Sequence, residues 1–484
     1  MLNTLIIAAD AVSPELFMND SIRFPNITKI IKNGASGSYS AYTGKYFSGS
    51  YDSGENWASI YTGLSPSVHN ISTYAVGLER RKPQMSDFER LSPFWQLLNK
   101  NDISIGVWAT HSVKKPTPIN GYVIGVDYTS KETPDDNRIR PRSIQVSLND
   151  NWIMDYLDGE PPPRIFPMPL KQQGFDYKEL MENKDLAEKA LREYTFAESI
   201  DNFKAELKYF SNSIYRVQKI RPVEVLWFYT PSTDLIGHFG GIRPDNSETL
   251  LRSYELLDSF IGDMIANLTP EKVVFFSDHG IRNFGDLVRC KDENISKEAF
   301  GAIDQSLFLP GGFIAMNARN GALLLSYHSL YGCFAACGVG IKKCQITEMQ
   351  TLDVYPTLLE LLDVKVPDGR SGFVQDIFTK EYVNKKNILQ KEKIKYKKLA
   401  FIQTHTVDIT DIFINELYLQ NRFIKITIIG NKKYSEIFRA NPRVNAFLAL
   451  EDIKLPQIMK HFDIVCTGYY NAKTKNFIPL VLKN

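Results

Sequence analysis

Three aspartates and three histidines, each placed close behind an apolar run, have the clearest capacity for chemistry in this sequence. They are Asp10, Asp234, His238, Asp278, His279 and His328. Carboxylate oxygens and neutral imidazole nitrogens are ligands that divalent ions such as zinc and manganese accept. Six such groups are enough for two neighbouring metal sites, an arrangement that suits phosphoryl transfer.

Each of the six residues also has an ordinary structural explanation when it is taken alone. An aspartate at the end of a strand often caps a helix or a turn, and a single histidine is more often packed than metal-bound. Asp234 and His238 are four residues apart, which puts both on one face of a helix but also fits a surface pair. The joint occurrence of all six behind predicted strands therefore carries the metal hypothesis.

The elements that must bring these residues together are buried strands. Largely apolar runs lie at residues 5–8, 223–229 and 273–277, and a helical pattern at residues 247–266 lies between the second and the third. Such strands alternating with helices are typical of a mostly parallel sheet with helices on both faces. The carboxyl ends of parallel strands lie at one edge of the sheet. The sequence thus predicts an α/β fold that gathers the six side chains there.

Changes in composition along the chain predict a main domain at residues 1–385 and a small α/β domain at residues 390–484. Residues 112–220 carry a Pro-Pro-Pro run and a polar helical segment, and we expect them to form a cap inserted into the main domain. A Lys-rich linker precedes the second domain, which has no glycine-rich phosphate loop. Its role is open.

Charge and cysteine content restrict the class of protein. Lys and Arg number 57 and Asp and Glu 55, so there is no overall basic field and nucleic acid is not an expected partner. The five cysteines are odd in number and show no Cys-x-x-Cys spacing, so disulfides are not expected. No apolar run is long enough to span a membrane and the start lacks a signal-peptide pattern. We expect a cytoplasmic protein without a membrane contact, and homo-oligomerisation stays open.

Several segments in one order resemble the alkaline phosphatase superfamily, most closely its type I phosphodiesterase/nucleotide pyrophosphatase branch. The matching segments are LIIAAD (5–10), FPNITKIIKNGASG (24–37), SGENWASIYTGLSPSVHNI (53–71), STDLIGH (232–238), FFSDHG (275–280), SYHSLYG (326–332) and LDVYPTLLELLDV (352–364). The resemblance spans about residues 1–380 without the insertion. It implies an alkaline phosphatase-like catalytic domain. The second domain has no match.

The resemblance implies a role for each of the six residues. One metal ion would be held by Asp234, His238 and His328, and the other by Asp10, Asp278 and His279. Zinc is the usual ion in the family, and manganese is the alternative.

The resemblance also implies a nucleophile and a hydrogen-bond donor. The family nucleophile is a Thr or Ser nine residues before a Thr-Gly pair, which is Thr62-Gly63 here and selects Ser53; composition alone would leave Ser48 and Ser50 open. Asn56 matches an Asn that donates to a phosphoryl oxygen, with a helix cap as its structural alternative.

Three positions depart from the family pattern. Ala11 and Asn70 stand where Gly is common, and Glu55 stands where many relatives have Pro. The Glu55 carboxylate would repel an anionic substrate nearby unless it were turned away or paired, so this departure bears on the substrate class more than on metal binding.

The function that the resemblance implies is metal-dependent hydrolysis of a small phosphorylated substrate. We expect cleavage of a phosphodiester or pyrophosphate bond, in a nucleotide or nucleotide-sugar, through a phosphoseryl intermediate. The alternatives are a phosphonate or phosphomonoester hydrolase, a phosphoryl-group transferase, or a non-catalytic scaffold that retains the fold.

Overall fold

The computed structural model divides the chain into two compact units. The larger comprises Met1–Gly44, Ser50–Lys297 and Ile303–Lys385, and the main segment of the smaller is Lys386–Asn484. The structure describes residues 2–41, 53–72, 76, 83–111, 117–127, 138–139, 143–162, 164–165, 174, 176–183, 185–186, 189, 198–240, 248–283, 315–317, 322–324, 326–329, 331–386, 397–402, 424–434, 444–449, 464–471 and 476–483.

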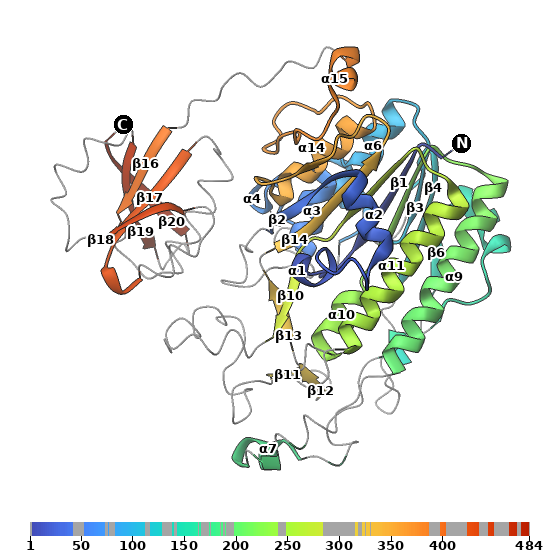
Figure 1. Ribbon diagram of the computed structural model, residues 1–484, viewed down its shortest axis with the longest axis horizontal. Helices are drawn as coiled ribbons and strands as arrows, with labels where there is room; N and C mark the ends of the chain where they lie inside the picture. The colour runs from blue at the N-terminus through green and yellow to red at the C-terminus, as the bar shows by residue number, and fades with distance from the viewer. Residues whose placement is uncertain are drawn as a thin grey trace. The chain divides into compact units, whose positions relative to one another are not determined.

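A mixed, mostly parallel sheet forms the centre of the larger unit (Figure 1). Within the described residues its nine strands lie in the order β15 (Cys344–Gln345), β2 (Gly34–Ser40), β14 (Tyr331–Gly338), β9 (Lys272–Phe276), β1 (Thr4–Ala9), β8 (Val225–Thr230), β3 (Ile105–Trp108), β4 (Gly121–Asp127) and β6 (Ser143–Val146). The five strands from β9 to β4 are parallel, whereas β14 and β6 run antiparallel to their neighbours. The predicted α/β fold is confirmed.

Side chains of the sheet alternate between two apolar cores because successive residues of a strand face opposite sides. In β1, Leu5 and Ile7 belong to one core and Ile6 and Ala8 to the other. The first core is covered by α1 (Pro14–Phe17), α2 (Pro25–Asn33), α9 (Glu198–Ile220), α10 (Ser232–Gly240) and α11 (Glu248–Leu268). The second is covered by α3 (Ser53–Thr62), α5 (Met85–Glu89), α6 (Phe94–Lys100) and α14 (Thr351–Leu361).

Local sequence signals explain where several of these helices begin and end. Pro25 occupies the first turn of α2, where its missing N–H costs nothing, and the Asp258 carboxylate accepts the N–H groups of Asn26 and Ile27. Gln350 and Asp353 form a capping box at the start of α14. The first cap connects α2 to α11, and the second is local to the start of α14.

Both ends of the expected insertion belong to the layers of the larger unit. β4 extends the central sheet beside β3, and α9 packs against α11 over the first core. The reason is visible in β4, whose apolar side chains Tyr122, Val123 and Ile124 are all buried. Between these ends lie η1 (Leu148–Tyr156), α7 (Tyr177–Glu182) and the paired strands β5 (Arg138–Ile139) and β7 (Arg164–Ile165).

The remaining elements in the described part of the larger unit are short. They are α4 (Pro66–His69), α15 (Lys380–Lys386) and two strand pairs, β10 (Gly280–Asn283) with β13 (Ser326–Ser329) and β11 (Ala315–Asn317) with β12 (Ala322–Leu324).

The smaller unit contains a sheet of its own. Its described strands lie in the order β18 (Val444–Ala449), β17 (Ile424–Gly430), β16 (Lys397–Ile402), β19 (Ile464–Asn471) and β20 (Asn476–Lys483), and β20 alone among them is antiparallel to its neighbour. Apolar runs near residues 399–404, 423–429 and 463–467 predict strands, and they correspond to β16, β17 and β19. The helices expected between them lie outside the described residues.

Across the described parts of both units, no helix combines the length and the apolar character needed to cross a membrane.

Candidate metal centre and active site

The carboxyl ends of two adjacent parallel strands bring the first group of candidate ligands together. β1 pairs with β9, so Asp10, which follows β1, lies beside Asp278 and His279, which follow β9. The Nε2 atom of His279 is 3.2 Å from Asp278 Oδ2 and 3.5 Å from Asp10 Oδ1. All three side chains are buried. We call them the buried group.

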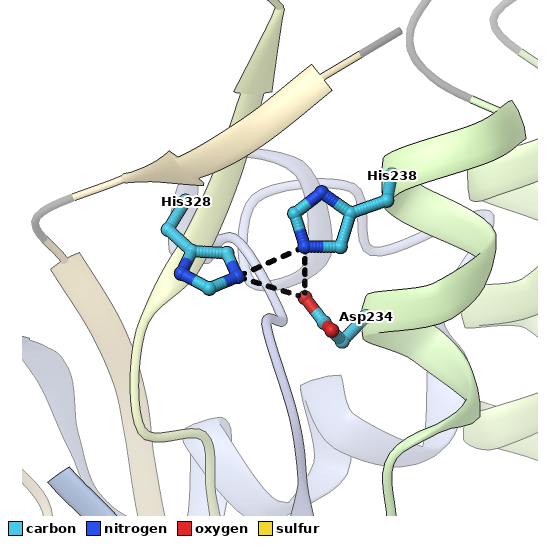
Figure 2. Close-up of side chains that lie close together, drawn as sticks. All are labelled: Asp234, His238 and His328. Atoms are coloured by element: carbon cyan, nitrogen blue, oxygen red, sulfur yellow. Dashed lines mark hydrogen bonds and ion pairs between the residues drawn. The ribbon is translucent and has the colours of Figure 1, made fainter. Parts of the chain in front are cut away.

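A helix and a strand pair supply the second group. Asp234 and His238 lie one turn apart in α10, and His328 lies in β13, opposite Ile281 of β10. Asp234 Oδ1 is 3.2 Å from His238 Nε2 and 3.3 Å from His328 Nε2, and the two nitrogens are 2.9 Å apart (Figure 2). We call these residues the half-exposed group, because the side chain of Asp234 keeps 22% of its surface accessible.

The spacing of these atoms fits metal ligation. Ligands held at 2.0–2.2 Å around a tetrahedral ion lie roughly 3.3 Å from one another, close to the separations in both groups. The buried oxygens Asp234 Oδ1 and Asp278 Oδ2 have no hydrogen-bond partner, although ring nitrogens lie within 3.3 Å of both. Such orphaned buried oxygens are rare. Each group therefore offers three ligand atoms that lie within 4.8 Å of one another.

The electrostatics of the centre also fit bound cations. Burial and the neighbouring Asp10 raise the pKa of Asp278 well above its usual value, and burial together with Asp234 raises that of Asp10. Burial opposes ionisation of Asp234 as well, but His238 and His328 hold its pKa well below its usual value. Burial lowers the pKa of His279. Buried carboxylates this close repel each other unless positive charge compensates them.

The outer oxygen of Asp10 is held by two donors that sequence patterns do not reveal. Tyr229 Oη donates to Asp10 Oδ2 at 2.7 Å and Trp57 Nε1 donates to the same oxygen at 3.1 Å. Apolar strand and helix patterns mark both aromatics as packing residues, and they do pack in the second core. Such outer partners orient a ligand and tune its basicity.

The first turn of α10 is attached on two sides. Thr233 Oγ1 donates to the carbonyl oxygen of Asp10 at 2.5 Å, and Ser232 Oγ donates to Glu206 Oε2 of α9 at 2.5 Å. All these groups are buried. The contacts fix the helix that carries Asp234 relative to β1, and hence one ligand group relative to the other.

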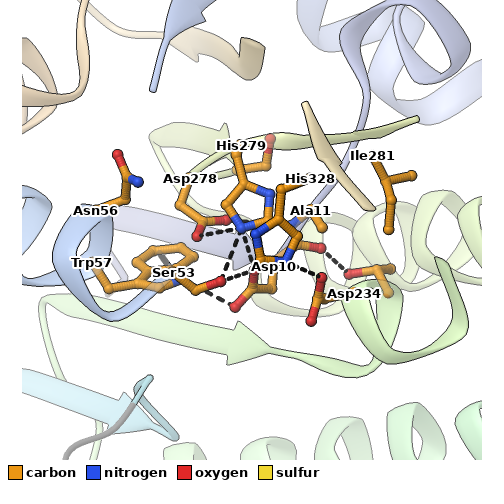
Figure 3. A network of polar contacts seen from close by, with 12 residues as sticks. Asp10, Ala11, Ser53, Asn56, Trp57, Asp234, Asp278, His279, Ile281 and His328 are labelled. Carbon is orange, nitrogen blue, oxygen red and sulfur yellow. Dashed lines mark hydrogen bonds and ion pairs between the residues drawn. The ribbon is translucent and has the colours of Figure 1, made fainter. Parts of the chain in front are cut away.

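Ser53 begins α3 and lies against the buried group. Its Oγ atom is 2.9 Å from His279 Nε2 and 3.4 Å from Asp10 Oδ1 (Figure 3). Ser48 and Ser50, the competing candidates, lie outside the described residues. The position of Ser53 beside three candidate ligands is what a nucleophile activated by a metal ion requires.

Asn56 is placed differently. It is fully buried, and its Oδ1 atom accepts a hydrogen bond from Thr351 Oγ1 of α14 at 3.1 Å. Figure 3 shows its amide turned away from the Ser53 hydroxyl. The structure thus gives Asn56 a contact between α3 and α14, and its role as a donor to phosphate stays a prediction.

The departures from the family pattern have structural counterparts. Ala11 and Asn70 both have φ of 54°, the left-handed region that glycine adopts without strain. Asn tolerates this conformation well, whereas Ala11 is strained directly beside Asp10, where its N–H donates to Asp278 Oδ1 at 3.3 Å. Glu55 is fully buried in α3.

Comparisons with known proteins found a matching family model and similar solved structures. The family model described as type I phosphodiesterase/nucleotide pyrophosphatase matches residues 4–328. Solved structures that are similar include murine ectonucleotide pyrophosphatase/phosphodiesterase 5, with 16% identity and a TM-score of 0.42 over 78% of this chain and 100% of that one. A mutant of the alkaline phosphatase PafA has 13% identity and a TM-score of 0.43 over 78% and 99%. No curated protein matches.

Proposed function

The chain belongs to the type I phosphodiesterase/nucleotide pyrophosphatase family, and we propose that it hydrolyses a phosphodiester or pyrophosphate bond in a nucleotide or nucleotide-sugar. One observation carries the proposal: the Ser53 hydroxyl lies 2.9 Å from His279 Nε2 and 3.4 Å from Asp10 Oδ1, within the buried group of candidate ligands. A hydroxyl in that position can attack phosphorus.

Two divalent ions complete the proposed centre. Asp10, Asp278 and His279 would hold one ion and the half-exposed group the other, with zinc as the proposed ion and manganese as the alternative. Bound there, the ions would neutralise charge on the phosphoryl oxygens and favour the ionised form of a hydroxyl or water.

Ser53 is the proposed nucleophile. Its oxygen bonds to phosphorus as the bond to the leaving oxygen breaks, which leaves a phosphoseryl intermediate. The position of Ser53 favours the buried group as its partner in this step. Ser53 also begins the ten-residue helix α3, whose N-terminal end offers partial positive charge to an anion.

The half-exposed group suits the second step, in which water releases the phosphoryl group from Ser53. The side chains of Asp234, His238 and His328 keep 22%, 14% and 10% of their surface accessible, so water reaches them more readily than it reaches Asp278 or His279. Attack by that water restores the Ser53 hydroxyl.

A substrate panel tests the proposal. Protein dialysed against a chelator and then reloaded with zinc would be assayed on bis(4-nitrophenyl) phosphate, 4-nitrophenyl phosphate, a 4-nitrophenyl phosphonate and a nucleoside diphosphate sugar. We expect the reloaded protein to cleave the diester and the pyrophosphate faster than the others. Faster cleavage of the monoester or phosphonate would favour those activities instead, and equal inactivity of both preparations on every compound would favour a scaffold.

A further inference from the structure

Another histidine, His111, lies at the sheet edge that carries the metal ligands, and it belongs to neither ligand group. His111 follows β3, which pairs with β8 as β8 pairs with β1. Trp108 at the end of β3 is level with Phe228 of β8, and Thr230 at the end of β8 is level with Ala9 of β1. β3 therefore lies two strand spacings from β1, or about 10 Å, and His111 lies beyond the same edge.

Two contacts connect His111 to the proposed machinery. Its backbone N–H donates to the hydroxyl of Tyr61 at 2.9 Å, and Tyr61 lies in α3, the helix that Ser53 begins. Its ring meets that of Tyr229 edge-on, with centroids 6.1 Å apart and planes at 89°. The Tyr229 hydroxyl in turn donates to Asp10. His111 is only half-buried, so a ligand at this edge can reach it.

The place of His111 beside Tyr229, whose hydroxyl donates to Asp10, indicates what its ring would bind. The two proposed ions match one phosphoryl group. A pyrophosphate has a second, charged phosphoryl group beside the first, and an imidazole N–H is a suitable donor to its oxygens.

We propose that His111 binds the second phosphoryl group of a pyrophosphate substrate and thereby favours pyrophosphates over simple diesters. The inference rests on the proposed function, because it names a residue for the second phosphoryl group, which the two ligand groups do not bind.

Nucleotide binding tests this role without turnover. Zinc-loaded Ser53→Ala protein, which should not consume nucleotide, would be titrated calorimetrically with AMP and with ADP. The same titrations would be made on Ser53→Ala proteins that also carry His111→Ala, His111→Gln or Thr110→Ala. ADP should bind more tightly than AMP. His111→Ala should weaken ADP binding about tenfold, the value of one hydrogen bond to a charged group, and AMP binding less than about twofold. His111→Gln, which keeps a donor, should retain part of the preference, and the neighbouring Thr110→Ala should retain all of it.

The outcomes separate this role from simpler ones. If His111 acted only by supporting Tyr229, its removal would weaken AMP and ADP binding equally, and that result overturns the proposal. The absence of any ADP preference, or an unchanged ADP affinity in His111→Ala, overturns it too. If zinc-loaded wild-type protein cleaves neither diesters nor pyrophosphates, the proposed function fails, whereas the binding comparison still decides the role of His111.

Discussion

The two ligand groups differ in how they are built and in how far water reaches them. Asp10, Asp278 and His279 stand at the ends of neighbouring central strands and are almost fully buried. Asp234, His238 and His328 come from one helix and one short strand pair and remain partly accessible. Two similar sites that differ in this way can divide a two-step reaction between them. In the proposed mechanism the buried group holds the nucleophile and the half-exposed group serves water.

The surroundings of the groups strengthen this contrast. Asp10 accepts hydrogen bonds from Tyr229 and Trp57 inside the second core, so its orientation is fixed by packing. The half-exposed group depends instead on α10, which is attached through Ser232 and Thr233. Changes near the first group should thus act on the nucleophile and its ion, and changes near the second on the later step.

The largest expected effect is that of Ser53→Ala. Removal of the hydroxyl should lower kcat on a diester more than about a thousandfold, because only transition-state stabilisation by the remaining groups is left. Metal content should stay at the wild-type value, since Ser53 is not one of the six candidate ligands. Mass spectrometry of wild-type protein stopped during turnover should find on Ser53 a phosphoryl group that still carries the second ester group of the diester. Undiminished turnover in the variant would show that Ser53 is not the nucleophile and that the buried group does not hold it.

Tyr229→Phe should weaken metal binding by the buried group and leave the half-exposed group unchanged. Burial keeps the pKa of Tyr229 well above its usual value, so its neutral hydroxyl donates to Asp10 at ordinary pH. Loss of such an outer partner costs about 10–100-fold in metal affinity. Competition with a chelator should show this loss for one ion and no change for the other, and Trp57→Phe should act in the same direction. Equal weakening of both ions would mean that the groups are not independent.

His69 provides a histidine that is buried without belonging to either group. Its Nε2 atom lies 3.1 Å from Ser59 Oγ, its Nδ1 atom accepts the N–H of Ile71, and burial lowers its pKa to about 3. Between this value and the unfolded value near 6.5, the unfolded chain binds the extra proton, so the free energy of unfolding falls as pH falls. The slope reaches about 1.4 kcal/mol per pH unit. Urea unfolding from pH 7 to 5 should give a slope that is smaller in His69→Gln than in wild type by about this amount, and identical slopes would contradict the assignment.

The smallest expected effect separates two roles for Asn56. Asn56→Ala and Thr351→Val each remove one partner of the same buried hydrogen bond and should each lower the free energy of unfolding by about 1–3 kcal/mol. A structural contact predicts little change of kcat in either variant. An additional loss of about a hundredfold in kcat for Asn56→Ala alone, the cost of a lost donor to a developing oxyanion, would establish the phosphate-binding role instead.

The parts of the fold that the sequence predicts are those with a strong local pattern. Continuous apolar runs mark β1, β8 and β9, and the aspartates and histidines behind them are the residues that the structure brings within reach of one another. His328 also follows an apolar run, but it reaches the site through pairing of β13 with β10, a contact between segments distant in sequence.

Other features depend on tertiary packing and leave no local pattern. Tyr229 and Trp57 have the pattern of core aromatics, and only the fold shows that their polar atoms meet at Asp10. β4 and α9 lie in a segment whose prolines and polar residues indicate an insertion, yet long-range pairing with β3 and packing on α11 include them in the central layers. These features depend on which distant segments pack together, and a single sequence does not show that.

Stepwise metal loading measures whether the two ligand groups bind one ion each. Chelator-treated wild-type protein and the variants Asp278→Asn and Asp234→Asn would be titrated calorimetrically with zinc, and each loaded sample would be assayed on bis(4-nitrophenyl) phosphate. We predict two ions per wild-type chain and one ion in each variant. Hydrolysis should occur only where both ions are bound. Fewer than two ions in the wild-type chain, or full hydrolysis after metal removal, would contradict a centre built from two ligand groups.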